Sequence, residues 1–290
     1  MIRIKAVYRW VFLGFFLGVP PVIANPSPYP HTDYPVSFSD IKALPVAQGA
    51  IPHSYGSAPS QYGLLWLPVA PRPAPLVMIV HGDCWLSDYD VEHIQPFASA
   101  LVRAGYAVWA PEYRRIGESG GGWPGMIDDL RAALALAARL EPGRINPERT
   151  VLVGHAAGGH LALWLATRRQ PVAADVTVLG TVGLSAITDL ALYRGTDNNC
   201  AAVVETLFDG DSQTQTARYR EASPARSENT ALPVQLLHGS DDQVVPVAQS
   251  RAMPGAELEV LQGAGHYDLI HPGTSAFPAV LRAIDAVLSP

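Results

Sequence analysis

The chain has 290 residues, of which 48% are hydrophobic and 16% are charged, so it can bury a sizeable core and does not have the composition of a disordered protein. Its formal net charge is -6, and no stripe of basic residues with interleaved aromatic residues occurs, which argues against nucleic acid as a partner. We expect neither a cofactor nor a bound metal, because the sequence contains no P-loop and no spacing typical of metal ligands.

The N-terminus has the three parts of a secretory signal peptide. Basic residues precede a short apolar run at residues 11–19, which Pro20 and Pro21 end, and Ala24 stands at the expected cleavage position. The apolar run is too short to span a bilayer comfortably, although an uncleaved anchor is the alternative. We therefore expect residues 1–24 to be removed and the mature protein to be periplasmic or secreted, with no membrane span left.

The mature chain begins with a proline-rich segment. Residues 25–60 show neither helical nor strand periodicity and are interpreted as a leader that wraps the surface, which places the main domain at residues 61–290. A strand is predicted at residues 62–67, and a stiff, proline-rich connector leads from it to a fully apolar strand at residues 76–80.

Strands and helices then alternate to the end of the chain. The patterns predict strands at residues 106–110, 150–153, 176–184, 233–237 and 257–261, and helices at residues 91–104, 126–140, 161–166 and 276–288. This alternation predicts an α/β fold with a mostly parallel central sheet and helices on both faces. Residues 186–231 are polar and irregular, and we expect them to form a small cap or lid.

The most informative motif joins the strand at 150–153 to the helix that follows it. The sequence GHAAG begins at Gly154 and ends at Gly158, which is the spacing of a nucleophile elbow, G-x-S-x-G. In an elbow, glycines flank a sharp turn that pushes one side chain into the site. Ala156 stands where the serine would be, and a methyl group has no atom that attacks a carbonyl. The sequence therefore predicts the frame of a serine hydrolase without its nucleophile.

An acid and a histidine follow in the order that a hydrolase triad of this type requires. Asp242 lies in the loop after the strand at 233–237, and His266 lies in a glycine-rich loop after the strand at 257–261. Taken alone, Asp242 is more typical of a turn, and His266 is more typical of a loop histidine bonded to the backbone. Their joint order after the elbow favours the catalytic interpretation, while the neighbouring Asp241 is interpreted as solvated or capping.

The oxyanion hole is expected between the elbow and the loop after the strand at 76–80. One backbone N–H donor would come from Ala157, and others from Asp83 and Cys84 in the loop. An aspartate in this loop is unfavourable if its carboxylate faces a developing oxyanion, because like charges repel. The chain has two cysteines, so an exported protein has one possible disulfide, Cys84 with Cys200; two buried free thiols are the alternative.

These motifs together resemble the esterase and formamidase branch of the α/β-hydrolase superfamily, which carries an HGGxW-type oxyanion motif and a G-x-S-x-G elbow. The resemblance rests on HGDCW, EYRR, GGGWPG and GHAAGGHLALW, which begin at residues 81, 112, 120 and 154, and on the two late loops. It extends over about residues 60 to 288 and implies an α/β-hydrolase fold with hydrolysis of carboxylic esters or amides. Relatives of this kind would carry serine at position 156 and glycine at position 83.

We therefore expect an exported hydrolase-family protein that is inactive or very weak, because Ala156 replaces the nucleophile. The alternatives are a pseudoenzyme that binds a small molecule without turnover, and an engineered Ser-to-Ala form of an active esterase or formamidase. The expected ligand is a small ester-like or amide-like molecule, and the oligomeric state is left open. Aromatic residues in the loops would line the pocket or pack in the core, namely Trp85, Tyr89, Tyr113, Trp123 and Tyr193.

Overall fold

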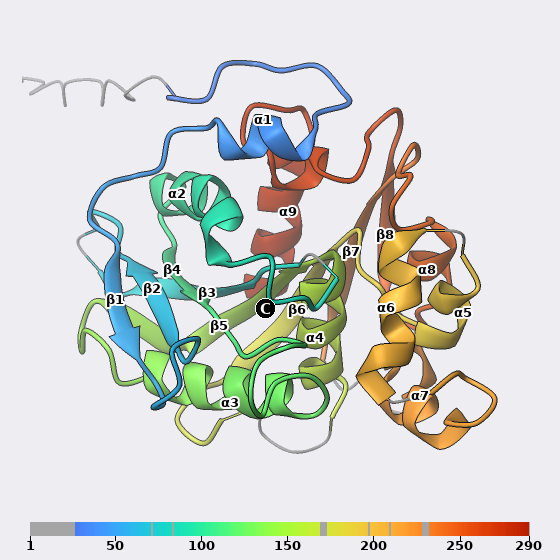
Figure 1. The fold of residues 1–290 in the computed structure, drawn as a ribbon. Coiled ribbons are helices and arrows are strands. Elements are labelled where there is room, and N and C mark those ends of the chain that lie inside the picture. The colour runs from blue at the N-terminus through green and yellow to red at the C-terminus, as the bar shows by residue number, and fades with distance from the viewer. Residues whose placement is uncertain are drawn as a thin grey trace, which may run out of the picture.

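The computed structural model describes residues 27–289, apart from residues 71, 83, 169–172, 197, 209 and 228–231. The predicted signal peptide therefore lies outside the described residues, and so does Asp83. Within the described part of the chain, the strands form one eight-stranded sheet, and helices cover both of its faces (Figure 1). This arrangement confirms the predicted fold class.

The sheet is parallel except at one edge. Its strands are β1 (Ile51–Ser54), β2 (Tyr62–Trp66), β3 (Ala74–Val80), β4 (Ala107–Pro111), β5 (Ile145–His155), β6 (Val178–Leu184), β7 (Val234–Gly239) and β8 (Glu257–Leu261). They lie in the order β1-β2-β4-β3-β5-β6-β7-β8, with antiparallel pairing between β1 and β2 and between β2 and β4. The edge strand β1 lies inside residues 25–60, so the segment interpreted as a leader contributes a strand to the sheet.

Two layers of helices enclose the sheet. The α-helices are α1 (Phe38–Lys42), α2 (Gln95–Arg103), α3 (Gly125–Ala137), α4 (Ala156–Ala166), α5 (Leu190–Arg194), α6 (Asn199–Phe208), α7 (Thr216–Ala222), α8 (Ala248–Arg251) and α9 (Phe277–Leu288). Short 3-10 helices are η1 (Val91–Ile94), η2 (Pro224–Arg226) and η3 (Asp268–Ile270). The predicted helix at 91–104 is thus divided into η1 and α2, whose first turn contains a proline. Among the described residues, no helix is both long enough and apolar enough to cross a membrane.

The central strand β3 shows how both faces of the sheet become core. Leu76 and Met78 belong to the apolar cluster that contains α3 and α4, whereas Val77 and Ile79 belong to the cluster that contains α2 and α9. Successive side chains of a strand point to opposite faces, so a strand covered on both sides must be apolar throughout. The uninterrupted apolar run at 76–80 is the consequence of this double burial.

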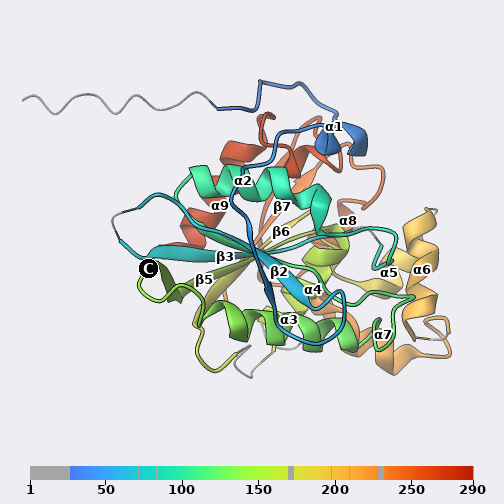
Figure 2. The same cartoon turned by 60° about the vertical axis from the view of Figure 1, so that its left-hand side comes forward.

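The described residues of the cap predicted at 186–231 include three α-helices and the short 3-10 helix η2. Figures 1 and 2 show α5, α6 and α7, in gold and orange, grouped at one side of the molecule beyond the sheet. The cap is tied to helix α4 by hydrogen bonds, including the bond from Trp164 Nε1–H of α4 to the Glu221 carbonyl at 2.9 Å. Residues that follow β6 therefore lie beside the helix that follows β5.

The turn between β5 and α4 has the backbone of an elbow. Ala156 has φ 52°, in the left-handed region that residues other than glycine rarely adopt, and it is the first residue of α4. A Cβ at Gly158 would collide with the carbonyl oxygens of Val80 and His81 at the end of β3. Gly158 thus lets α4 begin directly against the neighbouring strand, and this close approach places residue 156 at the tip of the turn.

We predict that Gly158→Ala lowers the free energy of unfolding by about 3 kcal/mol, at the upper end of the usual cost of overpacking, because the obstructing atoms are backbone. Chemical denaturation measures the change. Gly195→Ala is the matched control, since a Cβ there meets only ordinary contacts. It should change stability by less than about 1 kcal/mol. Equal effects of the two substitutions would contradict the proposed close approach.

Candidate active site

An aspartate–histidine pair lies at the carboxyl end of the sheet. Asp242 follows β7 and His266 follows β8, and His266 Nδ1 lies 2.8 Å from Asp242 Oδ2. The other carboxylate oxygen accepts hydrogen bonds from the backbone N–H groups of Val244 and Val245, each at 2.8 Å. Both side chains of the pair are almost completely buried. The carboxylate is therefore held in place, and it orients the imidazole with Nε2 as the nitrogen left for a ligand.

The electrostatics of the pair favour an ionised carboxylate. Burial alone would raise the pKa of Asp242, but the charge of His266 and the hydrogen bonds from His266 and the Val245 N–H outweigh it and hold the pKa well below its usual value. An ionised Asp242 accepts a hydrogen bond from the N–H at Nδ1 of His266. This is the orientation that a general base needs in a triad.

The pair faces a small cavity together with the elbow. The cavity has a volume of about 220 Å³, and Ala156, Ala157 and His266 all line it. The rest of its wall comes from the loop after β3, the cap and the loops after β7 and β8, through Cys84, Tyr89, Ile187, Tyr193, Asn198, Cys200, Gln243, Val244, Val245 and Tyr267. The structure thus brings together the three predicted triad positions, 156, 242 and 266, although position 156 presents only a methyl group.

The expected oxyanion hole is described in part. Ala157 is the second residue of α4, where a backbone N–H has no partner inside the helix, and it borders the cavity. Cys84 borders the cavity as well, and both Cys84 and Trp85 have positive φ values, of 60° and 59°. Asp83 lies outside the described residues. The two expected loops therefore meet at the same cavity.

A buried ion-pair network supports the loop after β3. The Glu112 carboxylate accepts backbone hydrogen bonds from Val91 and Tyr113, and it pairs with His81 Nε2 at 2.9 Å and with Arg115 at 3.0 Å. Burial alone would raise the pKa of Glu112, but the charges of His81 and Arg115 and the hydrogen bonds lower it overall. Arg115 is therefore a structural partner of Glu112, not a free cation for a ligand.

Two other charged residues near these motifs, Arg114 and Asp241, also contact neighbouring residues of the protein. Arg114 pairs with the buried Asp129, at 2.7 Å. Asp241 is exposed and accepts a hydrogen bond from the Ser240 hydroxyl at 2.6 Å, away from the pair formed by Asp242. Arg114 is therefore a structural partner of Asp129, whereas Asp241 is solvated.

Three of the five aromatic candidates do not line the cavity. Trp85 and Tyr113 are fully buried in the core, and Trp123 packs edge-on against Trp164 with ring centroids 5.0 Å apart. The Tyr113 hydroxyl donates to the His81 carbonyl at 2.9 Å. The candidates that do line the cavity are Tyr89 and Tyr193, and sequence reasoning missed Tyr267 and Gln243. Tyr267 directly follows His266 in the sequence, and this position could have indicated that it lines the cavity.

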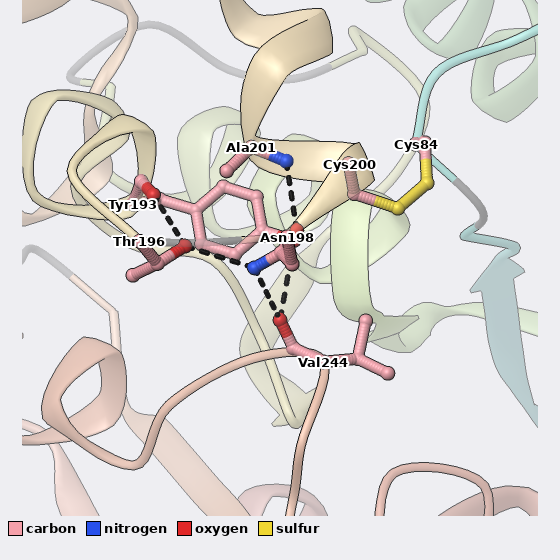
Figure 3. Close-up of a disulfide and its surroundings, with 7 residues drawn as sticks. All are labelled: Cys84, Tyr193, Thr196, Asn198, Cys200, Ala201 and Val244. Carbon is pink, nitrogen blue, oxygen red and sulfur yellow. Dashed lines mark hydrogen bonds between the residues drawn. A yellow bond between two sulfur atoms is a disulfide. The ribbon is translucent and has the colours of Figure 1, made fainter.

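A disulfide joins two walls of the cavity. Cys84, in the loop after β3, is bonded to Cys200 in the first turn of α6. Asn198, just before α6, donates to the Val244 carbonyl at 3.1 Å and accepts from the Ala201 N–H at 2.8 Å. Figure 3 shows both hydrogen bonds as dashed lines beside the disulfide. The cap is therefore attached on one side to the loop after β3 and on the other to the loop that carries Asp242.

Two buried histidines flank the site. His155, the residue before the elbow, donates from Nε2 to the His266 carbonyl at 3.0 Å, and the two rings lie 4.5 Å apart. Burial, and then the charge of His266, hold the pKa of His155 well below its usual value, so it is neutral. A neutral His155 supports the His266 loop without adding a positive charge of its own beside it.

His160 links α4, the cap and the loop after β3. Its Nε2–H donates to the Ala222 carbonyl at 2.8 Å, and its Nδ1 accepts from the Trp85 indole N–H at 3.3 Å. A second proton on Nδ1 would break the bond from Trp85. Burial lowers the pKa of His160 to about 4, although the bond to Ala222 opposes this shift.

The geometry defines the class of protein. A mostly parallel sheet with an elbow after β5, a carboxylate after β7 and a histidine after β8 is the arrangement of the α/β-hydrolase fold. The family model BD-FAE matches residues 65–256, more than half of the chain, and the chain therefore belongs to this family of esterase-like α/β-hydrolases.

Curated relatives agree with this assignment. The esterase LipC of Mycobacterium tuberculosis is 28% identical over 247 residues, which cover 74% of this chain and 59% of LipC. The probable carboxylic ester hydrolase LipM of the same organism is 28% identical over 189 residues, which cover 61% of this chain and 43% of LipM. The chain thus spans about half the length of these curated relatives.

Among solved structures, esterase B from Lactobacillus rhamnosis superposes with a TM-score of 0.72 at 19% identity, covering 87% of this chain and 90% of that chain. A truncated carbohydrate esterase from gut microbiota superposes with a TM-score of 0.68 at 19% identity, covering 82% and 95%. At sequence identities this low, the structural similarity shows the fold alone.

We predict that His160→Gln makes stability less sensitive to pH. Folded His160 stays neutral down to its pKa of about 4, whereas in the unfolded chain it takes up a proton below about pH 6.5. The native state therefore loses stability as the pH falls from 6.5 towards 4, by about 2 kcal/mol from this residue at pH 5. Urea unfolding at pH 7 and pH 5 should show a loss smaller by about that amount in the variant.

The control for this measurement is His31→Gln, because the His31 side chain is exposed. It should show the same pH-dependent loss as the native chain. If His160→Gln loses as much stability between pH 7 and pH 5 as the native chain does, His160 is not the residue that resists protonation.

Proposed function

We propose that this protein is a carboxylic ester or amide hydrolase by descent whose acyl-transfer step is blocked at position 156, and that its cavity binds a small ester-like or amide-like ligand with little or no turnover. The observation that carries the proposal is the combination at the elbow. Ala156 has the left-handed backbone of a nucleophile, and it borders the same cavity as His266, whose Nδ1 is paired with Asp242.

The size of the effect follows from the chemistry of acyl transfer. In a serine hydrolase the hydroxyl attacks the carbonyl while the histidine takes its proton, and loss of the nucleophile costs about 10⁶ in kcat, or about 8 kcal/mol of barrier. The donors of an oxyanion hole and the cavity itself remain useful for binding, since they hold a carbonyl group without reacting with it. Binding without turnover is therefore the activity that this arrangement retains.

A hydrolysis that uses water is the second candidate. It is favoured by one observation, the orientation of His266, because Asp242 occupies Nδ1 and leaves Nε2 for a water held in the cavity. Such a reaction would be weak, and it would be lost on His266→Gln.

We predict that Ala156→Ser raises hydrolysis of p-nitrophenyl acetate by at least about 10³-fold and introduces labelling by a fluorophosphonate. Ala156→Ser combined with His266→Gln is the matched control and should return to the native level. The double variant Ala156→Ser, Asp83→Gly separates the two departures from the esterase motifs. If it alone is labelled, Asp83 is a separate obstacle to catalysis.

Strong fluorophosphonate labelling of the native chain would contradict the proposal, because it would require a nucleophile other than residue 156. Sequencing the natural coding DNA at codon 156 distinguishes an inherited alanine from an engineered one.

We also propose that the protein is exported. The support is the charged start, the short apolar run and the small residue Ala24. Expression of the full chain in a secreting bacterium, followed by N-terminal sequencing, should give a protein that begins at Asn25. Ala24→Arg should block this cleavage, and a native chain recovered uncleaved in the cytoplasm would contradict the proposal.

A further inference from the structure

The disulfide lies in the wall of the ligand cavity. Cys84 and Cys200 both border the cavity, which Ala156 and His266 line as well. Neither cysteine is fully buried. A molecule that occupies the cavity therefore meets a sulfur–sulfur bond, an electrophile for thiolates, in the same space as a histidine.

His266 is oriented to accept a proton from a molecule in that space. Its Nδ1 is held by Asp242, so Nε2 is the nitrogen through which the ring meets a ligand. Other titratable groups around the ring are His155, His238 and Tyr267, and burial lowers the pKa of both histidines. His266 is thus the imidazole in this group that both borders the cavity and has a carboxylate at 2.8 Å.

We propose that the cavity is a site for small apolar thiols, which undergo exchange with the Cys84–Cys200 disulfide with His266 as the base. The thiol gives its proton to Nε2 of His266, and its sulfur attacks one sulfur of the disulfide. A bond forms between the two sulfurs, the Cys84–Cys200 bond breaks, and the departing cysteine thiolate takes the proton back from the imidazolium. One thiol and one disulfide are consumed, and one mixed disulfide and one thiol are formed. A second thiol completes the reduction of the mixed disulfide.

Residue 156 takes no part in this exchange, so this proposal does not depend on the proposed function.

The chemical class of the thiol follows from the lining of the cavity. The volume of about 220 Å³ and the aromatic walls from Tyr89, Tyr193 and Tyr267 fit a single ring or a short alkyl group. The ionised Asp242 behind His266 and the net charge of -6 disfavour anionic thiols. We therefore expect benzyl mercaptan to react faster than glutathione, which is larger and negatively charged.

The role of His266 has a measurable signature in pH. Only the thiolate attacks a disulfide, and an ordinary alkyl thiol is ionised to a few per cent or less at pH 7. A base in the cavity therefore accelerates the reaction most at neutral pH. Its advantage disappears at high pH, where the thiol ionises in water without help.

The experiment measures how fast the disulfide opens in the full native chain. Benzyl mercaptan in excess is added at pH values from 7 to 10, samples are quenched with iodoacetamide, and the alkylation of Cys84 and Cys200 is followed by mass spectrometry. His266→Gln is compared with His31→Gln, a matched substitution of an exposed histidine. Benzyl alcohol, which has the shape of the thiol without its reactivity, is tested as a competitor of the native reaction.

We expect His266→Gln to open at least about tenfold more slowly than the native chain at pH 7, with the difference shrinking towards pH 10. His31→Gln should match the native chain, and benzyl alcohol should slow the native reaction. Equal rates for the native chain and His266→Gln at pH 7 would overturn the proposal. So would a native rate that benzyl alcohol leaves unchanged, because attack would then come from the outer surface and not from the cavity.

Discussion

The close approach of helix α4 to the end of strand β3 is the constraint on which the site depends. Gly158 allows this approach, because any side chain there would collide with carbonyl groups of the neighbouring strand. The chain can then leave β5 and enter α4 only through a sharp turn, and residue 156 takes a positive φ at its tip. The cavity, the helix N-terminus and the histidine loop are all arranged around that point. The turn has this geometry with alanine at its tip, so the packing around Gly158 is sufficient to form it.

The cap and its attachments enclose one side of the cavity. The cap contributes Tyr193 and Cys200, and its attachments to the loop after β3 and to the loop after β7 join segments that are far apart in the chain. His160 adds a third attachment beneath the cap, through Ala222. Because the walls of the cavity are linked by a disulfide and by hydrogen bonds, its shape is largely formed before a ligand arrives, which lowers the entropic cost of binding.

The sequence alone was enough to predict the sheet and the members of the aspartate–histidine pair, since Asp242 and His266 each follow an apolar strand at the expected place in chain order. It was less informative about the walls of the cavity. Trp85 and Tyr89 lie in the same loop, yet one is completely buried and the other borders the cavity. Aromatic residues have the same local signature whether they pack inward or face a ligand. Likewise, β1 pairs with β2 from within a proline-rich segment that shows no strand periodicity of its own.

Local chemistry explains this division. Glycine spacing, apolar runs and the chain order of an acid and a histidine depend on neighbouring residues and on strand direction, so the sequence by itself determined the elbow, the alanine at its tip and the parallel sheet. The neighbours of a loop side chain depend on segments that are distant in the chain, as with Cys84 and Cys200, whose sequence separation is 116. Only the tertiary structure therefore decided which aromatic residues face the cavity, and that the disulfide forms part of its wall.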